Sequence, residues 1–146
     1  MRLTSITDEA RIALANLTDF ASGMIAPSVR LGVTGLSRAG KTVFITALVH
    51  NLVHGGRLPL FAAAKSGRLA GAHLEPQPDD AVPRFDFEAH VERMVAERVW
   101  PDSTRRISEL RVSIDYESAS HWNRRLGRGQ LHLDIVDYPG EWLLDL

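Results

Sequence analysis

A chain of 146 residues is long enough for one domain with a hydrophobic core and short for two. Its 17 basic and 18 acidic residues nearly cancel, so the net charge gives no reason to expect binding to nucleic acid. The absence of cysteine excludes disulfides and zinc–thiolate sites and fits a reducing cytoplasm. The sequence shows neither a signal-peptide pattern in residues 1–8 nor the ~20 consecutive apolar residues of a transmembrane segment.

An amphipathic helix that ends near Ser22 is the first predicted element. Apolar residues recur every three or four positions along it, and Gly23 and Pro27 stop it. Its polar face carries as many acids as bases, so packing against the rest of the protein explains it better than binding at a membrane surface. We expect residues 1–28 to pack as a helix on a domain formed by residues 29–146.

A strand, a glycine-rich turn and a helix are predicted next. The strand spans residues 29–34, and the largely buried helix ends at Gly55 and Gly56. Between them the turn Gly35–Thr42, GLSRAGKT, matches the phosphate-binding pattern G-x-x-x-x-G-K-S/T at every fixed position. In this setting backbone N–H groups and the N-terminus of the helix point at phosphate oxygens. The turn, a P-loop, therefore predicts binding of a nucleoside triphosphate with magnesium.

The positions of the P-loop have separate expected roles. Lys41 reaches the β- and γ-phosphates and acts in catalysis, and the hydroxyl of Thr42 ligates Mg²⁺. Both residues also count as nucleotide contacts. The other nucleotide contacts expected from this part of the chain are Ser37, Arg38, Ala39, Gly40 and Val43.

Residues 57–102 show the weakest pattern and are expected to form a helical insertion. Three prolines and two aspartates make 75–83 a loop. Apolar residues at helical spacing then predict a helix over 87–95, which ends before Trp100.

Two strands are predicted at 109–116 and 131–137. Apolar and polar residues alternate in the first, and apolar residues dominate the second. A polar, glycine-containing turn at 124–129 separates them, so we expect an antiparallel hairpin. Residues 141–146 have the pattern of the first turns of a further helix.

The segment Asp137-Tyr138-Pro139-Gly140 closes the second strand of the hairpin. A carboxylate at a strand end can lie near Mg²⁺, and a glycine three residues later can offer its N–H to the γ-phosphate. We assign these roles to Asp137 and Gly140, with an ordinary strand-to-helix turn as the alternative. Glu141 follows at a position that suits a water-orienting residue and is a candidate for catalysis; a helix-opening acid is the alternative.

A switch loop is predicted at residues 100–105, directly before the hairpin, where P-loop GTPases place a threonine that binds Mg²⁺ and the γ-phosphate. Thr104 is the expected residue and Ser103 the alternative, and both are candidate nucleotide contacts. Arg105 could neutralise charge on the transferred phosphoryl group in catalysis, or it is a solvated arginine. Trp100 could lie against the nucleotide, or it anchors the core.

Two further clusters have simpler interpretations. His50 and His54 lie one helical turn apart and could hold a metal, but the sequence offers no third ligand. Arg124, Arg125 and Arg128 gather on the hairpin turn, where solvent exposure explains them better than an anion or a membrane.

Taken together, these segments resemble the YcjX family of bacterial stress-associated P-loop GTPases. The resemblance is carried by 26–34 (APSVRLGVT) leading into the P-loop, 76–80 (PQPDD), 100–105 (WPDSTR) and 137–142 (DYPGEW). It implies part of a Ras-like GTPase core, which is a three-layer α/β P-loop NTPase sandwich, with the N-terminal helix and the helical insertion as additions.

The order of P-loop, threonine before the hairpin and D-x-x-G predicts a Mg²⁺-dependent molecular switch, and the resemblance implies that it binds GTP and hydrolyses it to GDP. The resemblance also implies a cytoplasmic or a peripheral inner-membrane location, and an inner-membrane partner protein encoded nearby. Guanine selectivity normally comes from an N/T-K-x-D segment on a later strand, which these 146 residues lack. The preference for GTP over ATP therefore rests on the resemblance alone.

Family members are several times longer, so the sequence is expected to correspond to their N-terminal part. In a Ras-like sheet 109–116 would lie at one edge, 131–137 beside it and 29–34 next, with later strands beyond. A truncated chain would leave an apolar strand edge bare, so we expect poor solubility or self-association. A small-molecule kinase or other ATP-using protein remains an alternative, as does a nucleotide-binding remnant without catalysis.

Overall fold

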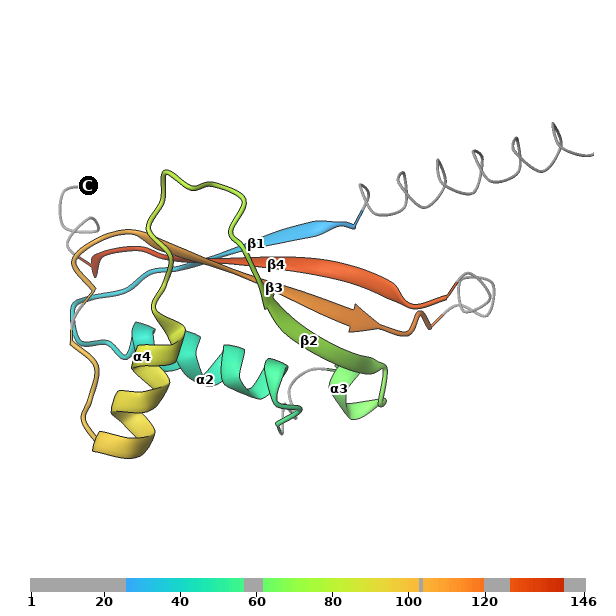
Figure 1. The fold of residues 1–146 in the computed structure, drawn as a ribbon, viewed down its shortest axis with the longest axis horizontal. Helices are drawn as coiled ribbons and strands as arrows, with labels where there is room; N and C mark the ends of the chain where they lie inside the picture. The colour runs from blue at the N-terminus through green and yellow to red at the C-terminus, as the bar shows by residue number, and fades with distance from the viewer. Residues whose placement is uncertain (1–25, 57–61, 103, 120–126, 141–146) are drawn as a thin grey trace, which may run out of the picture.

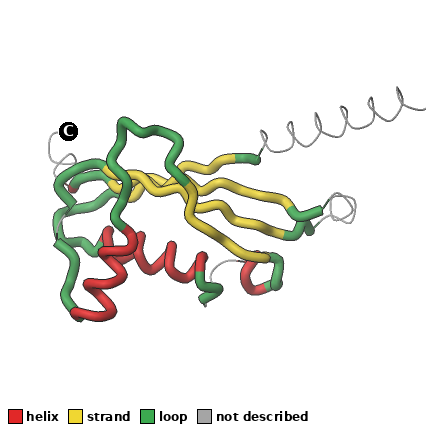
Figure 2. The backbone as a smooth tube through the Cα atoms, in the orientation of Figure 1, coloured by secondary structure: helices red, strands yellow, loops and turns green. Residues whose placement is uncertain are grey.

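The computed structural model describes residues 26–56, 62–102, 104–119 and 127–140, which form one sheet with helices on one of its faces (Figure 1). The predicted helix that ends near Ser22 and the predicted helical turns at 141–146 lie outside the described residues. None of the helices in the described part is both long and apolar enough to cross a bilayer. The secondary structure is mixed α/β (Figure 2). In chain order the elements are β1 (Ser28–Val33), α2 (Lys41–Val53), α3 (Ala62–Lys65), β2 (Leu69–Glu75), α4 (Phe87–Glu92), the π-helical turn η1 (Arg93–Glu97), β3 (Ser108–Tyr116) and β4 (Gly129–Asp137).

The sheet has four strands in the order β1-β4-β3-β2. β1 pairs in parallel with β4, whereas β4 with β3 and β3 with β2 are antiparallel pairs. The predicted hairpin and the place of its second strand beside β1 are therefore confirmed. The parallel register ends with Val33 opposite Asp137, so the P-loop and Asp137 lie at the same end of the sheet (Figure 1).

The prediction for residues 57–102 is wrong in one respect, because this segment contributes strand β2 at the edge of the sheet. β3 is consequently an inner strand, although the sequence placed it at the edge. The β2 sequence, LAGAHLE, is rich in alanine and glycine, which have low strand propensity. Its register also shifts between Leu69 and Gly71. Pairing with β3, and not local preference, therefore makes this segment a strand.

The hydrophobic core lies between α2 and the face of the sheet that this helix covers. Phe87, the first residue of α4, and Phe85, two residues before it, join the core, and α4 packs against α2. The expected helix over 87–95 corresponds to α4 and η1. The buried members of the core are Ile45, Leu48, Val49, Leu52, Phe85, Phe87, Leu110, Val112, Ile114 and Ile135.

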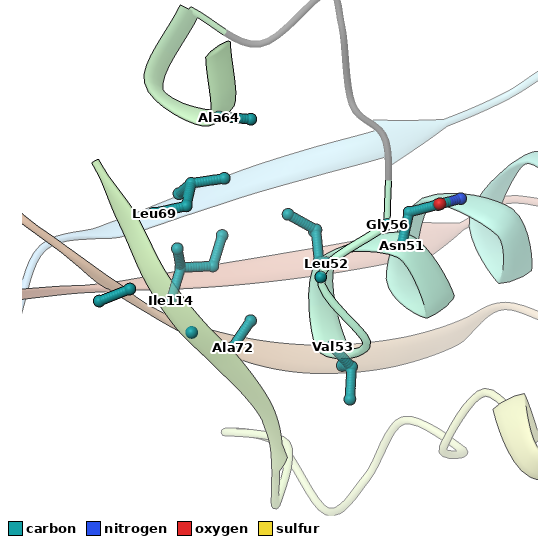
Figure 3. Close-up of a pocket in the computed structure, with 11 residues that line it drawn as sticks. Asn51, Leu52, Val53, Gly56, Ala64, Leu69, Ala72 and Ile114 are labelled. Carbon is teal, nitrogen blue, oxygen red and sulfur yellow. The ribbon is translucent and has the colours of Figure 1, made fainter. Parts of the chain in front are cut away.

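A hollow of about 310 Å³ lies at the C-terminal end of α2, between that helix, α3 and β2 (Figure 3). Apolar side chains such as Leu52, Leu69, Ala72 and Ile114 line it, and none of its described lining residues is titratable. Because the P-loop precedes the opposite end of α2, this hollow is separate from the predicted phosphate site.

The other face of the sheet carries charged side chains. Positive and negative side chains alternate across the four strands, because each lies opposite the next in register. In the order β1, β4, β3 and β2 they are Arg30, Asp134, Arg111 and Glu75. The Arg111 guanidinium donates to Asp134 twice, from Nε to Oδ1 at 2.6 Å and from Nη2 to Oδ2 at 2.8 Å. The Asp134 side chain is only 9% exposed. This bidentate pair links β3 to β4 across the hairpin.

Asp134→Ala is expected to lower the free energy of unfolding by about 3 kcal/mol, because it leaves the little-exposed guanidinium of Arg111 without its carboxylate. Urea denaturation followed by circular dichroism would measure the change. Asp80→Ala, at an exposed aspartate, is the matched control and should stay within about 0.5 kcal/mol of the parent chain. Equal stability of the two variants would show that the pair contributes nothing.

Candidate functional site

The P-loop joins the end of β1 to the first residue of α2, as the sequence predicts. The Ala39 N–H donates to the Leu36 carbonyl at 3.1 Å and closes a turn. Gly40, at the N-terminus of α2, has a φ of 87°, a left-handed conformation that glycine adopts at no steric cost. The second glycine of the pattern is therefore required by the backbone that leads the chain into the helix.

Lys41 is the first residue of α2, and its side chain folds back over the loop. Its Nζ donates to the carbonyls of Gly35 at 2.8 Å and Leu36 at 3.0 Å, and the residue is only 8% exposed. The ammonium is thus held in place by the loop itself. A cation fixed at this position can meet an anion without losing further side-chain freedom.

A chain of hydrogen bonds joins the three residues that the sequence assigns to the metal. Thr104 Oγ1 donates to Asp137 Oδ2 at 2.7 Å. Thr42 Oγ1 lies 3.1 Å from Thr104 Oγ1, and since the Thr104 proton is used on Asp137, Thr42 is the donor to Thr104. The three side chains come from the start of α2, the segment before β3 and the end of β4, and the structure brings them together.

The chemistry of this cluster fits a magnesium ion. Hydroxyl and carboxylate oxygens are the ligands that Mg²⁺ prefers, and it commonly takes only one or two carboxylates along with substrate phosphates. Asp137 is 1% exposed, and its Oδ1 has no hydrogen-bond partner among the described residues. Burial raises the pKa of Asp137, although the Thr104 hydrogen bond and the Lys41 charge act against this rise. A cation at this point would offset the cost of burying the carboxylate.

Histidine pairs do not provide a second metal site in the described part of the chain. The rings of His50 and His54 stack with centroids 4.3 Å apart, and His54 Nδ1 lies 3.0 Å from the His50 carbonyl. No group of three or more histidine, aspartate or glutamate side chains that could hold a metal occurs among the described residues. Stacking on the helix surface therefore accounts for this pair.

Gly140 lies directly against the backbone of the P-loop. A Cβ atom at this position would be 2.4 Å from the Gly35 carbonyl oxygen, 2.7 Å from the Ser37 nitrogen and 2.8 Å from the Leu36 carbonyl carbon. The N–H of Tyr138, two residues earlier, donates to the Val33 carbonyl at 3.0 Å. Only glycine allows this approach, which places the Asp137–Gly140 segment beside the P-loop.

The predicted switch loop forms one wall of a hollow of about 890 Å³ that opens beside the P-loop. Trp100 is 66% exposed, so the alternative that this residue anchors the core is wrong. Arg105 is exposed and lines the same hollow, together with Arg38 from the P-loop. The hollow is lined by Arg38, Trp100, Pro101, Asp102, Thr104, Arg105 and Arg106.

Several candidate residues fall outside the part of the chain that the structure describes. Ser103 and Glu141 lie outside the described residues, as do Arg124 and Arg125 of the hairpin turn. Arg128, the residue before β4, is exposed, which agrees with a solvated turn. The roles of these residues stay predictions.

Comparison with known proteins supports the relationship indicated by the motifs. A sequence model described as "YcjX-like family, DUF463" matches residues 29–146. The chain is 45% identical over 123 residues to the "Ras-like GTPase YcjX" of Escherichia coli (strain K12). This match covers 81% of this chain and 26% of the Escherichia coli protein. The chain is also 43% identical over 131 residues to the protein of the same name from Shewanella oneidensis. That match covers 81% of this chain and 27% of the Shewanella protein.

The chain thus spans about a quarter of the length of these curated relatives. The mixed α/β fold with its four-stranded sheet is compatible with part of a P-loop GTPase fold. The P-loop lies in the region that the family model matches. The resemblance inferred from the sequence is confirmed, and this chain belongs to the YcjX-like family of GTPase-like proteins.

Proposed function

We propose that this chain binds GTP together with Mg²⁺ and hydrolyses it to GDP, as part of a stress-associated molecular switch. The observation that carries the proposal is the hydrogen-bonded chain from Thr42 through Thr104 to Asp137, beside the ammonium of Lys41. The P-loop, the predicted switch loop and the D-x-x-G segment thereby meet in one place. The relatives named "Ras-like GTPase" favour guanine over adenine.

In this proposal Lys41 and the P-loop amides bind the triphosphate, and Thr42, Thr104 and Asp137 hold the metal. Bound magnesium would neutralise charge on the β- and γ-phosphate oxygens. Gly140 offers its N–H toward the γ-phosphate from its place against the P-loop. Because Thr104 and Gly140 belong to segments flanking the hairpin, loss of the γ-phosphate would release both, which is the basis of a switch.

The remaining assignments concern hydrolysis and the nucleotide's surroundings. Arg105, on the wall of the hollow beside the P-loop, would approach the developing charge of the transferred phosphoryl group. Glu141 would orient the attacking water. Trp100, whose indole is exposed on the same wall, would cover the bound nucleotide.

Fluorescent mant-GTP and mant-ATP, each titrated in Mg²⁺ and in EDTA, test the proposal. We expect saturable binding that depends on Mg²⁺ and favours mant-GTP. Phosphate release without any added acceptor would support hydrolysis over a kinase reaction. Binding without phosphate release would instead indicate a nucleotide-binding remnant, and an absence of Mg²⁺-dependent binding would reject the proposal as a whole.

A further inference from the structure

Two buried polar atoms near the candidate site have no hydrogen-bond partner among the described residues: Nδ1 of His90 and Oδ1 of Asp137. Buried polar atoms are nearly always paired, with protein or with an ordered water. His90 belongs to α4, and Asp137 is the last residue of β4. These two atoms are complementary, because an imidazole nitrogen can donate to a carboxylate oxygen.

His90 belongs to α4, which packs beside the helix that carries two of the site's residues. Phe87 of α4 is buried in the core, and α4 packs against α2, whose first two residues are Lys41 and Thr42. Figure 1 shows α4 beginning beside the first turns of α2, at the end of the sheet that carries the P-loop. The His90 ring is itself held by Phe85, with ring centroids 4.9 Å apart.

Charge interactions agree with this placement. The pKa of His90 is lowered, chiefly by burial, while the charge of Asp137 acts to raise it; His90 in turn acts to lower the pKa of Asp137. Three other charges act on the His90 pKa: Asp86 and Asp102 raise it, and Arg93 lowers it. A histidine with a lowered pKa is neutral at pH 7, so one ring nitrogen carries a proton and can donate.

We propose that His90 is a positioning residue for the magnesium site: its Nδ1–H donates to a single water that donates in turn to Oδ1 of Asp137. Thr104 already fixes the other oxygen, Oδ2, at 2.7 Å. With both oxygens held, the carboxylate has one orientation toward the metal. This inference rests on the proposed function, since it assigns His90 a role in metal binding. Groups that orient a metal ligand contribute about 10- to 100-fold in metal affinity.

Substitutions that move the polar atom test this role. The asparagine amide can occupy roughly the place of Nδ1, whereas the glutamine amide reaches toward Nε2, so His90→Asn should retain the link and His90→Gln should lose it. His90→Leu removes both nitrogens. His54→Leu, at an exposed histidine near the end of α2, is the matched control.

The measurement is Mn²⁺ affinity of the GDP-bound chain, from the electron paramagnetic resonance signal of free Mn²⁺. We expect His90→Leu and His90→Gln to weaken Mn²⁺ binding by about tenfold or more, with His90→Asn close to the parent chain and His54→Leu unchanged. Affinity for mant-GDP in EDTA should be the same in all variants, which separates metal positioning from a general loss of structure.

Equal Mn²⁺ affinity of the parent chain and His90→Gln would overturn the inference, even if His90→Leu failed to fold. So would an equal loss in His90→Asn and His90→Gln, because it would mean that the ring is needed only for packing on Phe85. Failure of the proposed function looks different: the parent chain would then show no Mg²⁺-dependent nucleotide binding at all.

Discussion

Lys41→Ala is expected to weaken binding of Mg²⁺–GTP by about 100-fold, which corresponds to about 2.8 kcal/mol. The Lys41 ammonium is nearly buried and is already held by the Gly35 and Leu36 carbonyls at 2.8 and 3.0 Å. Its attraction to phosphate is therefore little screened by water, and little side-chain entropy is lost on binding. The loop amides and the N-terminus of α2 remain in the variant, so weak residual binding should persist.

The chain offers a matched control for this substitution, because Lys65 is the only other lysine in its sequence. Lys65 is exposed in α3, well separated in sequence from the P-loop, and Lys65→Ala should leave mant-GTP affinity unchanged. Thermal unfolding of both variants would show that each is folded. An unaltered affinity in Lys41→Ala would mean that the loop does not bind phosphate in the way proposed.

The parts of the site that could be predicted are those with strong local patterns. The P-loop has fixed residue types at fixed spacing, and the alternation in β3 revealed one strand of the hairpin. Asp137 was assigned to the metal because it ends a strand and opens a D-x-x-G segment, and Thr104 because P-loop GTPases place a switch threonine before the hairpin. The hydrogen bonds from Thr42 to Thr104 and from Thr104 to Asp137, by contrast, became visible only in the structure.

Features that depend on distant partners escaped prediction. Strand β2 contains Ala70, Gly71 and Ala72, which favour a strand little, and is defined by its pairing with β3, for instance Glu75 opposite Arg111. A tryptophan is usually assigned to a core, yet Trp100 is exposed, and only the fold places it on the wall of a hollow. His90 gave no signal, because only the packing of α4 leaves its Nδ1 buried without a partner among the residues that the structure describes.

Gly140→Ala is expected to reduce Mg²⁺–GTP affinity by about tenfold or more, and to lower the free energy of unfolding by about 1–3 kcal/mol. The added methyl group would lie 2.4 Å from the Gly35 oxygen and 2.7 Å from the Ser37 nitrogen. These are backbone atoms of the P-loop, so they cannot move aside as the end of a flexible side chain could. Either the P-loop or the end of the Asp137–Gly140 segment must shift.

Gly71→Ala provides the control, since a Cβ at that exposed position in β2 would meet nothing within 4 Å. Mant-GTP titration and urea denaturation of the two variants would separate a local clash from a general effect of replacing glycine. Wild-type mant-GTP affinity in Gly140→Ala would show that the P-loop and the Asp137–Gly140 segment can move apart without weakening nucleotide binding.

The clash at Gly140 also bears on Lys41, because the Gly35 carbonyl that a methyl group would strike is one of the two that hold the Lys41 ammonium. A shift of that carbonyl would release the cation from its fixed position, so part of the affinity loss in Gly140→Ala should be the same loss seen in Lys41→Ala. The double variant should therefore bind more tightly than the sum of the two single losses predicts. Full additivity would instead mean that Gly140 acts on the nucleotide independently of the P-loop lysine.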